Sequence, residues 1–127
     1  MNDRILIAGG GIGGLATALA LAQKNIPSLV LEKAVELGEI GAGIQLGPNA
    51  FHCFDRLGVG ETARRMAVYI DQLRLMDSMA DGEICHIDLG EAFRRRYGNP
   101  YAVVHRGDLH GVLLQGCRDH SLIELRV

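Results

Sequence analysis

The chain has 127 residues, a length that suits one domain with its own core, because domains of about 100–150 residues are the commonest. Hydrophobic residues make up 48% and charged residues 22%, a balance typical of folded soluble proteins. The formal net charge of −2 gives no electrostatic reason to expect nucleic-acid binding. No apolar run reaches the ~18–20 residues of a membrane span, and the first strand begins too early to leave room for a signal peptide. We therefore expect a cytoplasmic protein that binds neither nucleic acid nor membrane.

The three cysteines are odd in number and form no C-x-x-C pair, which favours free thiols over a disulfide framework or a zinc site. Four histidines have no sequence partner that suggests a metal site, a catalytic triad or a proton relay: His52, His86, His110 and His120. We therefore predict no metal site.

Residues 5–8 are a short apolar run that predicts a strand buried on both faces. A G-x-G-x-x-G pattern follows at Gly9, Gly11 and Gly14, and residues 12–24 are almost wholly apolar and helix-forming. We expect Gly9 to allow the tight turn, Gly11 to let a pyrophosphate approach the backbone, and Gly14 to let helix and strand pack closely. The phosphates would lie at the positive N-terminal end of the helix.

A second strand is predicted at residues 28–31, and it ends on Glu32. A carboxylate at this point is typical of dinucleotide-binding folds, where it accepts hydrogen bonds from the adenosine ribose. The alternative is a structural glycine turn followed by a solvent-exposed glutamate.

Residues 36–47 form a glycine-rich loop, whose backbone we expect to run close against a flat partner; a flexible connector is the alternative. A helix should begin at Pro48 and end at Gly58, and a short helix should follow at residues 61–66. Alternating residues at 70–77 and 84–89, joined by Asp81-Gly82, predict an antiparallel hairpin.

Residues 91–97 predict a short helix that carries Arg94, Arg95 and Arg96, either as a solvated face or as a contact for an anionic cofactor or a partner subunit. Residues 101–105 are extended and apolar, a helix should run from Arg106 to about residue 119, and a third parallel strand should occupy residues 122–127. The long gap between the second and third strands, with a hairpin inside it, favours proteins of the FAD type over simple dehydrogenases.

The predicted fold class is therefore α/β: a Rossmann-like FAD-binding domain with parallel strands, interrupted by an antiparallel hairpin that belongs to a substrate domain. The expected division is residues 1–69 for the first part of the FAD-binding domain, 70–97 for the inserted piece, and 98–127 for the continued FAD-binding domain. Because the third strand would end the chain on an unpaired apolar edge, we expect the N-terminal part of a longer protein.

Three segments carry a resemblance to a known family: residues 9–15 with 31–33, residues 41–50, and residues 105–109. Together they resemble the FAD-dependent aromatic hydroxylases of the p-hydroxybenzoate hydroxylase fold. Within that family the chain is most similar to the salicylate hydroxylase and 3-hydroxybenzoate 6-hydroxylase branch, and residues 89–93 and 100–103 lean towards the latter.

The resemblance implies the following cofactor-binding residues: Gly9, Gly11, Gly13 and Gly14 at the pyrophosphate, Glu32 and Lys33 at the ribose, Gly43 and Gln45 along the flavin end, Arg106 at the phosphates or ribityl chain, and Val127 near the adenine. For Arg106 the alternative is an ordinary surface arginine.

Asp71 and Tyr101 flank the inserted hairpin and are the candidate catalytic residues, facing the substrate cavity. Their alternatives are a surface carboxylate and a half-buried core tyrosine. We interpret His105 as a core histidine bonded to backbone.

The resemblance also implies an activity. FAD would be reduced by NADH or NADPH and would use dioxygen to hydroxylate a small aromatic acid, with 3-hydroxybenzoate converted to gentisate as the leading expectation and a homodimer as the full-length assembly. Two alternatives stay open: another FAD hydroxylase of the same fold, of the salicylate or ubiquinone-pathway type, or a non-catalytic FAD-binding fragment.

Overall fold

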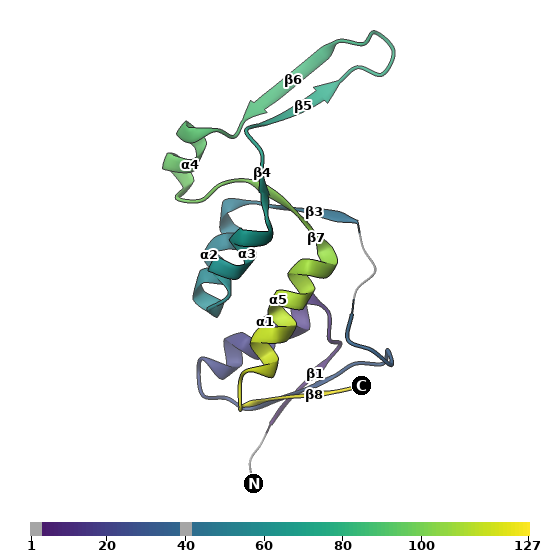
Figure 1. The fold of residues 1–127 in the computed structure, drawn as a ribbon, viewed down its shortest axis with the longest axis vertical. Helices are drawn as coiled ribbons and strands as arrows, with labels where there is room; N and C mark the ends of the chain where they lie inside the picture. The colour runs from purple at the N-terminus through teal and green to yellow at the C-terminus, as the bar shows by residue number, and fades with distance from the viewer. Residues whose placement is uncertain (1–3, 39–41) are drawn as a thin grey trace.

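The computed structural model describes residues 4–38 and 42–127 (Figure 1). Residues 39–41, which lie within the predicted glycine-rich loop, fall outside the described residues. The strands are β1 (Ile5–Ala8), β2 (Ser28–Leu31), β3 (Gly43–Leu46), β4 (Val68–Tyr69), β5 (Gln72–Met76), β6 (Glu83–Asp88), β7 (Ala102–His105) and β8 (Ile123–Arg126). The helices are α1 (Ile12–Ala22), α2 (Pro48–Leu57), α3 (Gly60–Met66), α4 (Glu91–Tyr97) and α5 (Arg106–Arg118).

A parallel sheet with the strand order β1-β2-β8 forms the base of the molecule. It brings together the two ends of the chain, because β2 pairs with β1 from the N-terminal part and with β8 from the C-terminal part. Helices α1 and α5 pack against each other and on this sheet (Figure 1). The predicted α/β fold class with a late third parallel strand is therefore confirmed.

The prediction that residues 5–8 are buried on both faces is wrong. β1 is an edge strand of the described sheet, and Ile5 and Leu6 are 47% and 66% exposed. The central strand is β2, where Ser28 and Val30 are fully buried because they are flanked by strands on both sides. An apolar run in a parallel strand does not by itself tell a central position from an edge position.

A second sheet, with the order β3-β7-β4, is antiparallel and was not predicted. Residues 43–46 lie in β3 of this sheet, so the part of residues 36–47 that was expected to be loop is wrong at its C-terminal end. β7 lies between β3 and β4, and its inward residues Ala102 and Val104 are buried. This pairing makes residues 102–105 a central strand, which explains their apolar character.

The predicted hairpin is confirmed as β5 and β6, which pair only with each other and project away from the helices (Figure 1). Asp81 has a positive φ of 50° in its turn, where the Asp77 N–H donates to the Gly82 carbonyl at 2.7 Å. At its base the Leu89 N–H donates to the Asp71 carbonyl at 2.8 Å. The predicted helices at residues 48–57, 61–66 and 91–97 are confirmed as α2, α3 and α4.

The hydrophobic core lies between the two sheets and joins every helix except α4. Its largest fully buried apolar side chains are Phe51, Leu15, Leu109, Leu113 and Val30. No helix in the described residues is both long and apolar enough to cross a bilayer.

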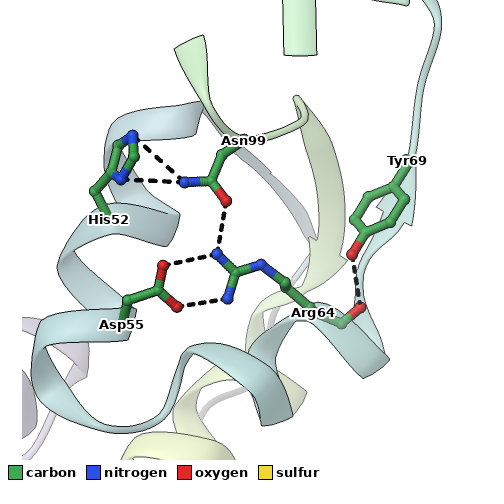
Figure 2. Close-up of polar contacts among 5 residues, drawn as sticks. All are labelled: His52, Asp55, Arg64, Tyr69 and Asn99. Atoms are coloured by element: carbon green, nitrogen blue, oxygen red, sulfur yellow. Dashed lines mark hydrogen bonds and ion pairs between the residues drawn. The ribbon is translucent and has the colours of Figure 1, made fainter. Parts of the chain in front are cut away.

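A polar network around Arg64 ties α2 and α3 to the segment that precedes β7 (Figure 2). The Arg64 guanidinium donates to both Asp55 carboxylate oxygens, at 2.5 and 2.7 Å, and to the Asn99 side-chain oxygen at 2.6 Å. The Asn99 amide faces the His52 ring at 3.2 Å, and the Tyr69 hydroxyl donates to the Arg64 carbonyl at 3.4 Å. Through these contacts a single arginine fixes how the chain leaves and re-enters the body around the hairpin.

Replacing Arg64 with methionine should lower the free energy of unfolding by about 2 kcal/mol, because the buried Asn99 oxygen would lose its partner. The matched control is Arg65→Met, since Arg65 is exposed and contacts only Glu61 and Thr62 within its own helix. That control should change stability by less than about 0.5 kcal/mol. Urea unfolding followed by circular dichroism measures both, and equal losses in the two variants would contradict a special role for Arg64.

Candidate functional site

The turn between β1 and α1, residues 9–14, is called the glycine loop below. Gly9 has φ +106°, a backbone conformation that side-chain-bearing residues rarely adopt. The Gly9 N–H donates to the Leu31 carbonyl at 2.7 Å, so the loop starts from the end of the neighbouring strand. The tight turn assigned to Gly9 from the sequence is therefore present.

Gly14 lies where α1 passes the start of the glycine loop. A Cβ at this residue would overlap the Gly9 carbonyl oxygen and would touch the Ile7 side chain at 3.4 Å. Gly13, in contrast, faces open space. The expected close packing of helix and strand at Gly14 is thus seen in the structure.

The N-terminus of α1 has no side chain that caps it. Gly11 is the N-cap residue, it supplies no side-chain hydrogen bond, and the first turn carries no acidic residue. The first amides of a helix lack partners within the helix and lie at its positive end, so this terminus is suited to an anion.

Glu32 follows β2 and reaches back to the glycine loop. One carboxylate oxygen accepts the Gly10 N–H at 2.7 Å, and the other accepts the Ala34 N–H at 2.9 Å. These backbone donors, Ala34 first and then Gly10, hold the pKa of Glu32 below its usual value. Glu32 is therefore a fixed carboxylate beside the loop, while the neighbouring Lys33 is exposed.

Val127 lies on the other side of Glu32. The Glu32 N–H donates to the Arg126 carbonyl at 2.9 Å, which brings the end of β8 next to the end of β2. A cavity of about 640 Å³ opens here, and its lining includes Val35, Leu37, Leu125 and Val127. The predicted residues of the glycine loop, Glu32, Lys33 and Val127 thus form one group at the ends of the parallel strands.

A second group of predicted residues lies on the antiparallel sheet. Gly43 in β3 is opposite His105 in β7, directly before Arg106. The Tyr101 hydroxyl donates to the Gln45 side-chain oxygen at 2.6 Å. The Arg106 N–H donates to the Ala42 carbonyl at 3.2 Å, and α5 begins at this residue. Gly43, Gln45, Tyr101 and Arg106 are therefore neighbours.

Asp71 is not part of either group. It lies at the base of the hairpin with its side chain 80% exposed, and it accepts a hydrogen bond from Arg94 at 2.8 Å. The Arg94 guanidinium also lies 5.7 Å from the centre of the Tyr69 ring. Of the basic run, Arg94 thus joins α4 to the hairpin base, and Arg95 and Arg96 are exposed.

Two histidine interpretations made from the sequence are wrong. His105 is not a core residue, because its side chain is 54% exposed and lies 3.9 Å from Asp108. His110, which was given no role, is 2% exposed and its Nε2 lies 2.7 Å from the Gly10 carbonyl oxygen. A signal existed for His110, since it follows the buried Leu109 on the helix face that packs on the sheet, but its partner is 100 residues away.

The three cysteines are free, as predicted. Cys53 and Cys85 are exposed, whereas Cys117 is buried, and burial raises the pKa of its thiol to about 11. The described residues contain no group of three or more His, Cys, Asp or Glu side chains that could hold a metal ion.

No family model matches the chain. A 3-hydroxybenzoate 6-hydroxylase of Aquipseudomonas alcaligenes is 57% identical over 126 residues, which are 99% of this chain and 32% of that protein. A 3-amino-4-hydroxybenzoate 2-monooxygenase of Streptomyces platensis is 36% identical over 114 residues, which are 90% of this chain and 29% of that protein. The chain spans about a third of the length of the curated relatives that it matches.

This chain is a relative of the 3-hydroxybenzoate 6-hydroxylases. The resemblance inferred from its motifs is therefore confirmed.

Solved structures of flavin-dependent monooxygenases share the fold of this 3-hydroxybenzoate 6-hydroxylase relative. The p-nitrophenol 4-monooxygenase PnpA of Pseudomonas putida superposes with a TM-score of 0.85 at 21% identity, covering 98% of this chain and 31% of the other. HpxO of Klebsiella pneumoniae, in complex with FAD and uric acid, gives a TM-score of 0.78 at 27% identity, covering 96% and 30%.

Replacing Gly14 with alanine in this hydroxylase relative should lower the free energy of unfolding by about 3 kcal/mol, because the new methyl group overlaps the Gly9 carbonyl. Gly13→Ala is the matched control on the same helical turn, where the methyl group meets nothing and the change should stay below about 1 kcal/mol. Chemical denaturation of the ligand-free protein compares them. A Gly14→Ala variant as stable as Gly13→Ala would show that the helix does not pack this closely.

Glu32 should also contribute to stability in a pH-dependent way. Because its pKa is lowered in the folded state, the contribution is present above the unfolded value of 4.5 and is lost as the pH falls through the lower folded value. The stability difference between the wild type and Glu32→Gln should therefore shrink as the pH is lowered from 7 to below about 4. Denaturant titrations at several pH values measure it, and a difference that grows on acidification would refute the assignment.

Proposed function

We propose that the protein containing this chain is an FAD-dependent monooxygenase that hydroxylates 3-hydroxybenzoate at position 6, with NADH or NADPH and dioxygen as co-substrates. One observation carries the proposal: 57% identity over 126 residues to a 3-hydroxybenzoate 6-hydroxylase. The aromatic substrate would be converted to 2,5-dihydroxybenzoate, which is gentisate.

The glycine loop fits the pyrophosphate of FAD. Its helix terminus has no side-chain cap, Gly9 has the turn conformation, and Gly14 brings α1 close to the turn. We propose that Gly9, Gly11, Gly13 and Gly14 border the phosphates, where backbone N–H groups and the helix terminus stabilise negative charge. The absence of an acidic side chain from the first turn supports this, since a carboxylate there would repel the phosphates.

The adenosine end of FAD would lie beside Glu32. Its carboxylate is ionised and held by two backbone donors, and each oxygen has capacity to accept a further bond from a ribose hydroxyl. Lys33 would lie alongside, and Val127, at the cavity next to β8, would contact the adenine.

The flavin end would lie along β3 and the start of α5. Gly43 and Gln45 would offer backbone amides to the ring, and the Arg106 guanidinium would bind phosphate or ribityl oxygens. The hydrogen bond between Tyr101 and Gln45 supports a role for Tyr101 at the border of flavin and substrate. Asp71 is proposed to act from the hairpin side, where Arg94 holds its carboxylate in place.

When bound, FAD supplies acceptance of a hydride from the nicotinamide cofactor and activation of dioxygen. The residues of this chain bind and orient it, and they exclude water from its buried side. Position 6 of 3-hydroxybenzoate is para to the hydroxyl group, so removal of the phenolic proton would direct electron density to the carbon that is hydroxylated.

The parts of the chain would divide this work. Residues 1–69 and 98–127 are proposed to hold FAD, and residues 70–97 are proposed to belong to the substrate-binding part. The isolation of β5 and β6 from the core supports that division. A homodimer of the full-length protein is proposed as its assembly, and the cytoplasm as its location.

Other substrates of the same reaction class remain as alternatives. Relatives that act on 3-amino-4-hydroxybenzoate share only 36% of residues with this chain, which favours 3-hydroxybenzoate over such rings and over salicylate or ubiquinone precursors. A non-catalytic FAD-binding fragment is the alternative of a different class.

The purified full-length protein should show flavin absorption bands, release FAD on denaturation, and oxidise NADH or NADPH several-fold faster when 3-hydroxybenzoate is added. Product analysis should find 2,5-dihydroxybenzoate in equal amount to the nicotinamide cofactor consumed. Salicylate and 3-amino-4-hydroxybenzoate serve as control substrates, and an intact mass identifies a shortened chain. Stimulation by a control substrate alone would reject the proposed substrate, and failure to take up FAD would reject the proposed cofactor.

A further inference from the structure

The imidazole of His110 contacts the glycine loop from the interior of the protein. His110 lies in the second turn of α5, it is 2% exposed, and its Nε2 is 2.7 Å from the Gly10 carbonyl oxygen. A carbonyl oxygen can only accept a hydrogen bond, so the imidazole must donate from a protonated Nε2. A buried backbone carbonyl without a partner is costly, and His110 removes that cost at this position.

Gly10 is held from its N–H side as well. Its N–H donates to Glu32 at 2.7 Å, and the preceding Gly9 N–H donates to the Leu31 carbonyl at 2.7 Å. Gly10 itself is buried, and a Cβ there would overlap the Leu37 side chain. The first half of the glycine loop is thus fixed by three bonds, of which only the bond from His110 comes from α5.

The geometry of the peptide bond links this contact to the proposed ligand. In a trans peptide the C=O of one residue and the N–H of the next lie in one plane and point in opposite directions. With the Gly10 carbonyl directed inward to His110, the Gly11 N–H is directed away from His110. Gly11 is the N-cap of α1, where the proposed pyrophosphate binds.

We propose that His110 is a positioning residue for FAD, which sets the Gly10–Gly11 peptide plane so that the Gly11 amide faces the phosphates. The inference rests on the proposed function, because it assigns His110 a role in binding the proposed cofactor. It also explains why a polar residue occupies a core-facing position of α5, between Leu109 and Val112.

The test uses three variants of the full-length protein. His110→Leu keeps an apolar side chain in the core but removes the donor, and His110→Gln places an amide N–H near the position of Nε2. Val112→Ala is the matched control, because it removes buried volume from the same helix without touching the glycine loop. The measurements are the FAD dissociation constant, from flavin fluorescence, and hydrogen–deuterium exchange of the peptide covering residues 9–14 in the ligand-free protein.

His110→Leu should weaken FAD binding about tenfold, the size expected for one lost hydrogen bond to a buried group, and should speed exchange in the loop. His110→Gln should restore most of both properties, and Val112→Ala should lower the melting temperature without weakening FAD binding. Equal FAD affinity and loop exchange in His110→Leu and the wild type would overturn the inference. So would a Gln variant as impaired as the Leu variant, because packing alone would then explain the loss.

The wild type separates this inference from the proposed function. A wild-type protein that fails to bind FAD rejects the proposed cofactor and, with it, the role of His110 towards that cofactor. A wild type that binds FAD as tightly as His110→Leu leaves the proposed cofactor intact and rejects only the role of His110.

Discussion

The close approach of α1 to the turn that precedes it is the constraint on which the candidate site depends. Because Gly14 has no side chain, the helix passes directly over the Gly9 carbonyl, and its N-terminus is held against the ends of the parallel strands. Glu32 then reaches the loop with its carboxylate, and β8 closes on the far side of β2. An anion site, a fixed carboxylate and an apolar cavity meet at one edge because that single contact is short.

Helix α5 connects this edge to the antiparallel sheet. It begins at Arg106 beside β3, it contacts the glycine loop one turn later through His110, and it ends against α1 with Cys117. The two groups of predicted residues, one near the parallel strands and one on β3 and β7, are therefore held in a fixed relation by one helix. A dinucleotide needs such a frame, since its two ends must be recognised at separate places.

The local elements could be predicted from the sequence, because their signals are local. Glycine spacing, Pro48 at a helix start, Gly58 at its end and the Asp81-Gly82 turn each specify one backbone conformation. The positions that failed depend on distant partners. The burial of β1 depends on which strands flank it, the strand at 43–46 exists because β7 pairs with it, and the partner of His110 comes from the opposite end of the chain. Tyr101 and Gln45 were assigned to different roles, and only the folded chain joins them.

The burial of Cys117 has a chemical consequence of its own. Its thiol lies between α5 and α1, 3.4 Å from the Leu15 carbonyl, and its raised pKa keeps it in the unreactive protonated form at neutral pH. Cys53 and Cys85 lie on the surface and are open to alkylating reagents at all times. Modification of the third thiol therefore requires the two helices to separate, so the protein carries a built-in chemical record of the opening of its nucleotide-binding frame.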